Sequence, residues 1–489
     1  MSAGLLALAV LSYAFWLTDG RFNFWHPGAG LELTFNSMLD HLLRGEFDVD
    51  PLIAGKEGFY RDGRVFAYWG IFFAVIRWPL TLFTGGLDID VTRLSCLVAV
   101  SIAAYAKLQT LHLISVSSPA TAGRYILYLA VALSILFAGA QIAFLRPVLY
   151  QEVCLWAGAL AAIFVYFAVR GIRYGRFAVS SMCAMAFVAG LALNARVSMG
   201  VGLYAAISLL MLAMLLRPLQ GSGEDSATAS GATTFSARVF SGPILLPSLL
   251  LLGFAALAGL VNYQRWGDPL VFADYRLYIM NELFPDRLPR TQAYGFFNLS
   301  RVPFGIVYYF FPIWVLRRDD GHLLFEEHQW RLIDATELPP SSFFLTDTLL
   351  MLLLSYAGWS LLNARRCGGI NRLHALAIGT GLAASCWLML SAISMNFRYR
   401  IEFYPLIEFG AFLGFLLLCR LPRADSSLRR VCTLAGVSSA LGIVASHLVM
   451  ILYKVSDFGP AIDMLRYGVF AHYLDRLKSF FTFSASWIQ

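Results

Sequence analysis

Residues 19–80 read DGRFNFWHPGAGLELTFNSMLDHLLRGEFDVDPLIAGKEGFYRDGRVFAYWGIFFAVIRWPL, a polar and aromatic segment that directly follows the first apolar run. Around it the chain is strongly apolar: its 489 residues are 58% hydrophobic and only 14% charged, and the mean hydropathy is +0.66. Soluble domains carry about 25% charged residues. The composition therefore predicts an all-α, polytopic integral membrane protein. Acids, arginines and aromatics gathered in one loop of such a protein suggest chemistry at a membrane face.

Charge and cysteine usage exclude several classes of protein. The formal net charge is +7. Cytoplasmic loops explain this charge, and no basic run carries stacking aromatics, so nucleic acid is not expected as a partner. The seven cysteines lie in or beside apolar runs without a CxxC pair, which predicts neither a zinc site nor a disulfide framework. The run at residues 4–18 lacks a basic n-region and a cleavage site, and is predicted to be a retained span.

Eleven apolar runs are long enough to cross about 30 Å of hydrocarbon. They lie at residues 3–19, 91–115, 124–145, 148–169, 177–195, 197–216, 243–262, 344–363, 373–394, 401–419 and 431–453. The run at 66–84 contains Arg77, Pro79 and many aromatics, which favours an interfacial or re-entrant helix over a span. We thus divide the chain into an N-terminal transmembrane module (1–216), a flexible cytoplasmic linker (217–242) and a C-terminal transmembrane module (243–489).

The distribution of arginine predicts the orientation of the chain. With eleven spans and the N-terminus inside, four arginines fall in short outside loops, namely Arg146, Arg196, Arg398 and Arg400. Thirteen fall in short inside loops: Arg124, Arg170, Arg173, Arg176, Arg217, Arg238, Arg365, Arg366, Arg372, Arg420, Arg423, Arg429 and Arg430. Because positive charge concentrates in cytoplasmic loops, we predict a multi-pass plasma (inner) membrane protein. Its periplasmic segments are then residues 20–90, residues 263–343 and the tail after 454.

The four outside arginines lie at the boundaries of different spans, in FLRPVLYQE, LNARVSMG and MNFRYRIEF. One interpretation is snorkelling or ion pairing with Glu152 or Glu402. The other is that together they bind a phosphorylated lipid, because arginine recognises phosphate through bidentate hydrogen bonds. Glu152 follows Arg146 by six residues. It either forms a structural pair or aligns a substrate hydroxyl or the arginine side chain.

Two carboxylates of the first outer loop are candidate catalytic groups. Glu32 and Asp40 lie in GLELTFNSMLDHLLRGEF, a predicted short helix, and eight residues of spacing place them about 80° apart on it. A solvated helix face is the alternative. The DVD run at residues 48–50 could bind a divalent metal, although such acids also form solvated turns. In KEGFYRDGR, Arg61 and Arg64 belong to a local charge network and are further candidate substrate contacts.

The second outer loop contains the aromatic stretch SRVPFGIVYYFFPIW at residues 300–314. Its composition predicts an interfacial helix packed on the lipid bilayer. Stacking on the face of a sugar is the alternative. Asn298-Leu-Ser300 also matches the pattern of an N-glycosylation acceptor.

Transfer of a sugar from a lipid phosphate needs a base for the acceptor hydroxyl and cations for the departing phosphate. One loop carboxylate and the outside arginines are a minimal set for that reaction. A transporter or flippase for a lipid-linked saccharide is the alternative. Transporters place ionisable groups near the bilayer midplane, whereas most charges here lie at span ends, with Lys107 and Glu408 inside runs. A non-catalytic scaffold would leave the loop acids and the outside arginines without a role.

In arrangement, the chain resembles the GT-C superfamily of polytopic membrane glycosyltransferases. A span is followed at once by a long outer loop with an early acid, Glu32, and then by GEF at residues 45–47. GRVFAYWGIFFAVIRWPL at 63–80 leads into an amphipathic helix, and Tyr150 and Glu152 form a Y-x-E after an outer turn. RYRIEFYP at 398–405 is similar to a late outer element of bacterial members. The resemblance covers about residues 20–200 and 395–420.

The resemblance implies a hexosyl- or pentosyltransferase, similar to the bacterial mannosyltransferase and arabinosyltransferase-like families. Its donor would be a polyprenyl-phosphate sugar, its acceptor a glycan or lipid, and its cofactor none beyond a possible divalent metal. The first-loop acid would be the base on the periplasmic face, and Glu32 matches that position. Many members have an adjacent acidic pair where this chain has Leu31-Glu32, so Asp40 remains the rival. Tyr150 counts with Glu152 among the substrate contacts.

Overall fold

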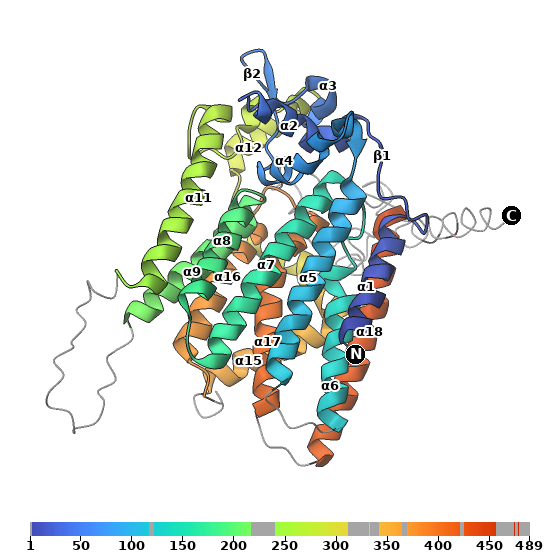
Figure 1. Cartoon of the computed structure of the whole chain (residues 1–489), viewed down its shortest axis with the longest axis vertical. Coiled ribbons are helices and arrows are strands. Elements are labelled where there is room, and N and C mark those ends of the chain that lie inside the picture. Colours follow the sequence, from blue (N-terminus) through green and yellow to red (C-terminus); the bar gives the residue numbers. More distant parts are fainter. Residues whose placement is uncertain are drawn as a thin grey trace.

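The computed structural model describes residues 2–116, 122–216, 240–311, 342–363, 369–420 and 425–455, together with Leu332, Leu474 and Lys478. This part of the chain is a helical bundle with loops gathered at one end (Figure 1). Its helices of 15 residues or more are α1 (Ser2–Leu17), α5 (Thr92–Ser115), α6 (Ala122–Phe137), α7 (Leu149–Tyr174), α8 (Val179–Leu193), α9 (Val197–Leu216), α11 (Gly242–Trp266), α15 (Thr348–Leu362), α16 (Arg372–Leu390), α17 (Tyr404–Arg420) and α18 (Asp425–Val455). Each predicted span falls on one of these helices, so the all-α, polytopic prediction is confirmed.

Most of the long helices have the lengths that a membrane requires. Eight helices in the described part of the chain are long and apolar enough to cross it, which makes the chain a multi-pass membrane protein. Three others, α1, α8 and α15, have 16, 15 and 15 residues, or about 24 Å at most. The predicted linker and the tail after 454 fall almost entirely outside the described residues.

One predicted span ends earlier than its apolar run. The run at 124–145 is helical only to Phe137 and continues as the 3₁₀ turn η5 (Gly139–Gln141). Gly139 has a left-handed φ of +50°, and a Cβ there would lie 1.8 Å from a carboxylate oxygen of Asp347. Only glycine fits this position, so the close approach of Asp347 fixes the end of α6.

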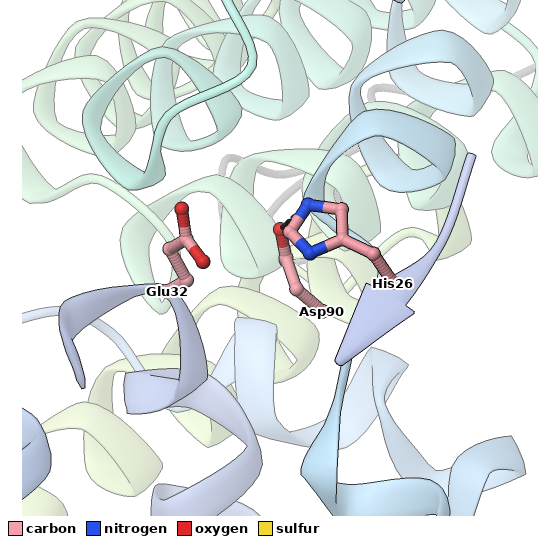
Figure 2. Close-up of side chains that lie close together, drawn as sticks. All are labelled: His26, Glu32 and Asp90. Atoms are coloured by element: carbon pink, nitrogen blue, oxygen red, sulfur yellow. Dashed lines mark ion pairs between the residues drawn. The ribbon is translucent and has the colours of Figure 1, made fainter. Parts of the chain in front are cut away.

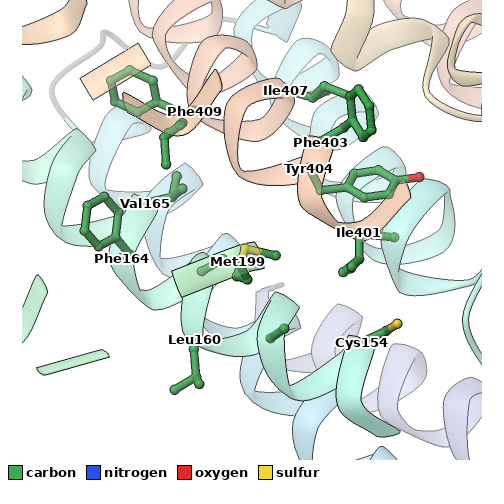
Figure 3. Close-up of a cluster of buried hydrophobic side chains, with 14 of the residues drawn as sticks. Cys154, Leu160, Phe164, Val165, Met199, Ile401, Phe403, Tyr404, Ile407 and Phe409 are labelled. Carbon is green, nitrogen blue, oxygen red and sulfur yellow. The ribbon is translucent and has the colours of Figure 1, made fainter. Parts of the chain in front are cut away.

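Helix α17 is the centre of the bundle. The candidate span that contains it, Phe397–Arg420, is 89% buried, whereas the span of α11 at the edge is 22% buried. Figure 3 shows its side chains packed against those of α7 and Met199 of α9. Elsewhere small residues bring backbones together: a Cβ on Gly381 of α16 would lie 2.2 Å from the Ala206 backbone of α9. Such close approach is how transmembrane helices gain contact without a hydrophobic driving force.

We call the loop layer at one end of the bundle the cap, and define it as residues 20–91 and 267–301 (Figure 1). Its first segment contains β1 (His26–Pro27), η1 (Gly30–Leu33), α2 (Thr34–Leu43), α3 (Pro51–Ala54), η2 (Gly55–Glu57), β2 (Phe59–Arg61), β3 (Arg64–Phe66), α4 (Phe72–Ile76), η3 (Trp78–Leu82), η4 (Gly86–Asp88) and β4 (Ile89–Asp90). Its second segment contains η6 (Tyr275–Leu277), η7 (Ile279–Glu282), α12 (Arg287–Tyr294) and η8 (Leu299–Arg301).

The strands of the cap join distant parts of the chain. β1 pairs antiparallel with β4, with His26 opposite Asp90. β2 and β3 form a hairpin across Asp62 and Gly63, whose φ angles of +50° and +80° are those of a tight Asp-Gly turn. A bridge from Phe59 to Tyr278, with their rings stacked at 4.7 Å, ties the two segments together.

Two aromatic stretches were predicted to lie at the bilayer interface. The stretch at 66–84 forms only the short pieces α4 and η3, about 16 Å of helix, which is too little to span. Trp78 and Phe83 are exposed beside it, as expected for an interfacial segment. In the second stretch, helix α13 (Val302–Phe310) buries Tyr308 and Tyr309 fully, with the Tyr309 ring 4.9 Å from that of Phe403, whereas Ile306 and Phe311 are exposed. Protein, rather than lipid, covers the face that carries the two tyrosines. Residues 312–314 lie outside the described residues.

Candidate functional site

Three side chains that carry chemistry meet in the cap: His26, Glu32 and Asp90 (Figure 2). One ligand atom of each lies within 4.8 Å of those of the other two. His26 Nε2 is 3.3 Å from Asp90 Oδ2, while Nδ1 of the same ring lies 2.9 Å from the Pro27 carbonyl oxygen. Asp90 is 4% exposed and Glu32 is exposed. The group therefore presents one accessible carboxylate against a fixed imidazole–carboxylate pair.

Local backbone geometry brings these residues together. Glu32 lies on η1, which starts at Gly30 with a left-handed φ of +55°. A Cβ at Gly28 would lie 2.4 Å from Leu33 and 3.2 Å from the Cβ of Asp90, so only glycine lets η1 close onto β4. Asp90 is held from its other side, because its Oδ1 accepts a hydrogen bond of 2.8 Å from the Thr92 amide at the start of α5.

Sequence reasoning identified Glu32 but missed His26 and Asp90. These two lie at opposite ends of the first loop, and they meet only through the pairing of β1 with β4. No spacing motif signals such a contact. The polar residues that flank the loop, in WHP and DID, were the available clue.

The rival acid Asp40 lies in a different group. Its carboxylate pairs with Arg44 at 2.9 Å, one turn further along α2, and both side chains are about half exposed. This is a solvated i,i+4 pair, the alternative that the sequence had left open. Asp40 is thus engaged by Arg44 and does not belong to the group formed by His26, Glu32 and Asp90.

A second group of possible metal ligands, His41, Glu46 and Asp48, lies beside that pair. His41 Nδ1 is 3.0 Å from Asp48 Oδ1. Arg64 lies 3.9 Å from both Glu46 and Asp48, so a cation already faces these acids. The candidate substrate contact Arg64 is thus engaged in the charge network that the sequence suggested.

The two acids of the DVD run do not share one site in the described structure, although Asp48 belongs to the group with His41 and Glu46. Asp48 faces His41, whereas Asp50 caps α3 by accepting a hydrogen bond from the Leu52 amide at 2.8 Å. By contrast, His26, Glu32 and Asp90 offer one nitrogen and two carboxylates, a donor set that suits Mn²⁺ or Zn²⁺. Of the two groups, this is the one whose acids face no arginine among the ion pairs of the described residues, and it is the better candidate to hold a divalent ion.

Of the four outside arginines, Arg196 and Arg400 are engaged by buried carboxylates. Arg196 pairs with Glu402, which also accepts a hydrogen bond of 2.6 Å from Ser198. Arg400, 1% exposed, donates to Thr346 at 2.9 Å and lies 4.0 Å from Asp347. The ion-pair interpretation therefore fits both, and Glu402 is the partner that the sequence had offered.

Arg146 and Arg398 lie over tyrosine rings. The Arg398 guanidinium is 4.2 Å from the centre of Tyr150 and 5.8 Å from that of Tyr399, and Arg146 is 5.5 Å from Tyr453. Cation–π contact of this kind orients an arginine side chain. Arg398 and Tyr150 are therefore in contact, and their role in binding a phosphate stays a prediction, as does that of Arg146.

Glu57 belongs to KEGFYRDGR, the stretch in which the sequence suggested a local charge network. It accepts a hydrogen bond of 2.7 Å from the Tyr278 hydroxyl and so joins the two cap segments. Tyr150 lies within electrostatic reach of both Glu57 and Arg398. Burial, and then the negative charge of Glu57, raise the pKa of Tyr278. Burial likewise raises the pKa of Tyr68, against the opposing charge of Arg398. Glu57 and Arg398 are thus charged neighbours of the same tyrosines, Tyr68 and Tyr150.

Glu152 and Arg61 have structural partners. Glu152 is 0% exposed, accepts a hydrogen bond from Arg77 at 2.8 Å through Oε2, and has its Oε1 2.7 Å from the same nitrogen, so it forms a structural ion pair with Arg77 rather than with Arg146. Arg61 lies 3.1 Å from Asp62 and donates at 3.0 Å to the Arg265 carbonyl at the end of α11. Contact of either residue with a substrate therefore has no support from this geometry.

No family model matches the sequence, and no curated protein matches it. Solved structures of one protein, the oligosaccharyltransferase of Archaeoglobus fulgidus, are similar in shape. Its apo form has a TM-score of 0.45 at 11% identity, covering 94% of this chain and 58% of that one. The form tethered to an acceptor peptide has a TM-score of 0.46 at 10% identity, with 93% and 57% covered. The complex with an inhibitory peptide and a dolichol-phosphate has 0.45 at 12%, with 94% and 58% covered. The chain thus spans less than two thirds of that enzyme, and a likeness at this level assigns it no activity.

Proposed function

We propose that the protein is a membrane glycosyltransferase of the GT-C type. It moves a sugar from a polyprenyl-phosphate donor to a glycan or lipid acceptor at the periplasmic face of the plasma membrane. The observation that carries the proposal is Glu32, an exposed carboxylate held beside His26 and Asp90 in a cap directly over the spans. A carboxylate so placed can reach a hydroxyl at the membrane surface.

In the reaction, Glu32 takes the proton of the acceptor hydroxyl, whose oxygen forms a bond to the anomeric carbon of the sugar. The bond from that carbon to the phosphate oxygen breaks, and the polyprenyl phosphate leaves with the electron pair. A phosphate leaving group needs no proton, so one base is enough. His26 and Asp90 orient Glu32 and provide a polar surround for the hydroxyl.

Donor recognition falls to Arg398 and Tyr150, with Arg146 at the same boundary. Arg398 lies 4.2 Å over the Tyr150 ring, an arrangement that can present guanidinium donors to a phosphate. Positive charge there stabilises the charge that develops on the departing phosphate. Arg196 and Arg400, which the sequence also offered, instead brace this region through Glu402 and Asp347.

A divalent ion fits the same group without being needed by it. His26, Glu32 and Asp90 would hold it, and when bound it would polarise the acceptor hydroxyl and favour the loss of its proton. Glu32 acts on the acceptor hydroxyl, whereas Arg398 acts on the donor phosphate, so the two residues have separate roles in the transfer.

The second candidate function is a transporter or flippase for a lipid-linked saccharide, and one observation favours it. Lys107 of α5 and Glu408 of α17 form a buried pair inside the spans, 2.5 Å apart. Ionisable groups at such a depth often mark a transport path. The cavity beside them has a volume of about 10 Å³, however, which is room for about one water molecule. The small volume of this cavity favours a structural pair over a transport path.

Proteoliposomes that contain the purified protein separate the two functions. They are given radiolabelled undecaprenyl-phosphate sugars and candidate glycan or lipid acceptors. The transferase predicts label on the acceptor, lost in Glu32→Gln. Label that crosses the bilayer while still attached to the carrier would support the transporter instead. Transfer that survives both Glu32→Gln and Asp40→Asn would overturn the assignment of a loop carboxylate as the base.

A further inference from the structure

We propose that Asn36 is a positioning residue, fixed by the buried Arg77–Glu152 ion pair, that sets Asp90 and His26 around Glu32. The inference rests on the proposed function and deepens its site. It also gives a role to Glu152, which lies too deep to meet a substrate. The argument follows hydrogen bonds from the membrane boundary into the cap.

The first step is the edge of the small sheet. Carbonyl groups alternate in direction along a strand. The Asp88 carbonyl accepts from the Gly28 amide on the β1 side, at 2.9 Å. The carbonyls of Leu87 and Ile89 face the opposite edge, where the Asn36 side chain donates to both at 2.9 Å. The Asn36 amide thus makes the hydrogen bonds that a third strand would make, and it fixes the backbone immediately before Asp90.

The second step is what fixes Asn36. The residue is 2% exposed on α2, and its Oδ1 accepts a hydrogen bond of 3.2 Å from Arg77 Nε. This contact orients the amide: when its oxygen accepts from Arg77, its nitrogen faces the two carbonyls. The flipped orientation would place the amide nitrogen against Arg77, and a guanidinium has only donors and cannot accept from it.

The third step anchors Arg77 itself. Its Nη2 lies 2.7 and 2.8 Å from the two oxygens of Glu152, at the start of α7, and its guanidinium is 5.8 Å from the centre of the Phe35 ring. Both charged side chains are at most 3% exposed. A buried pair of this kind breaks only with a large loss of stability, so α7 supplies a fixed point from which the cap is built.

The chain of contacts therefore runs from Glu152 through Arg77 and Asn36 to the strand that ends in Asp90. The donor contacts Arg398 and Tyr150 lie outside it. Loss of Asn36 should thus disturb the base while leaving donor binding unchanged. This separation distinguishes a positioning role from general support of the fold.

The test compares Asn36→Leu and Glu152→Gln with the control Asn281→Leu. Asn281 also donates its amide to a backbone carbonyl of the cap, that of Tyr275, at 2.7 Å, but in the second segment. Transfer from a radiolabelled undecaprenyl-phosphate sugar should fall about 10- to 100-fold in kcat for the first two variants, with an unchanged KM for the donor. Because both act through one chain, the double variant should be no slower than the worse single variant.

A second readout needs no turnover. Carbethoxylation of His26, followed by mass spectrometry in detergent micelles, should accelerate several-fold in Asn36→Leu, because Asp90 no longer holds Nε2. The exposed His112 should be labelled at the wild-type rate in every variant. If the wild type transfers no sugar, the proposed function fails while this measurement still decides the role of Asn36.

Two results would overturn the inference. One is wild-type labelling of His26 in Asn36→Leu. The other is an equal loss of kcat in Asn281→Leu and Asn36→Leu together with a raised donor KM in both, which would mean that any loosening of the cap has the same effect.

Discussion

Neutralising Lys107 alone should destabilise the protein far more than neutralising it together with Glu408. The two charges are 2.5 Å apart and at most 6% exposed, and Lys107 also donates to Gln141 at 2.8 Å. At an effective dielectric constant of about 20, two charges 2.5 Å apart attract by about 7 kcal/mol. Desolvation opposes this by several kcal/mol for each ion. The net value of the pair is therefore small, but a lone buried carboxylate is costly.

We expect Lys107→Met to lower the free energy of unfolding by about 3–5 kcal/mol. The double variant Lys107→Met/Glu408→Leu should lie within about 1 kcal/mol of the wild type, because it leaves no uncompensated charge. Arg44→Met is the matched control: its pair with Asp40 is about half exposed, and its loss should be at most about 0.5 kcal/mol. Unfolding in mixed micelles of dodecylmaltoside and SDS measures all three.

Sugar transfer by the double variant extends the same experiment to function. A structural pair predicts a stable double variant that still transfers sugar, whereas a transport path through Lys107 and Glu408 predicts loss of function in a stable protein. The reasoning is refuted if Lys107→Met is no less stable than Arg44→Met, or if the double variant is at least as destabilised as Lys107→Met.

Three further predictions concern the cap and the donor contact. Arg398→Gln should raise the KM for the polyprenyl-phosphate donor by about 10- to 100-fold, as expected for a lost charged hydrogen bond, and Arg398→Lys should not restore it, because lysine lacks the planar fork; an unchanged KM would exclude the contact. Equilibrium dialysis with Mn²⁺ should show one bound ion lost in His26→Ala and retained in His112→Ala; equal occupancy in both would place the ion elsewhere. The raised pKa of Tyr278 stabilises the fold below the ordinary tyrosine pKa of about 10, and that stability is lost as pH rises above it. The thermal midpoint should therefore fall above pH 10 in the wild type and less steeply in Tyr278→Phe; parallel curves would count against it.

Much of the helical architecture follows from the sequence, because a bilayer imposes one local requirement on every span. Runs of about 20 apolar residues have few alternatives to a helix. The predictions failed where contacts between distant segments determine the end of a helix or the burial of its face. The run at 124–145 is cut short at Gly139 by Asp347, which comes from another part of the chain. The aromatic face of α13 is buried because Phe403 covers it, and no local pattern reveals that cover.

The site was predictable only in part, for the same reason. Glu32 stands out by its position after the first span, but His26 and Asp90 are 64 residues apart in the sequence and meet only because β1 pairs with β4. The arginine bias located the boundary of the membrane, yet it could not tell Arg398, which lies over tyrosine rings, from Arg400, which lies beside Asp347. Partner choice of this kind depends on packing between helices, and a single sequence does not display it.

The central claim is that Glu32 is the base of a sugar transfer at the cap. Single-turnover transfer from a radiolabelled undecaprenyl-phosphate sugar tests it most directly, with Asp62→Asn as the control because the Asp62 side chain is 83% exposed on the β2–β3 turn. Loss of a general base should slow transfer by about 10²- to 10⁴-fold in Glu32→Gln, with Asp62→Asn at the wild-type rate. Transfer by Glu32→Gln at the rate of Asp62→Asn would contradict the account.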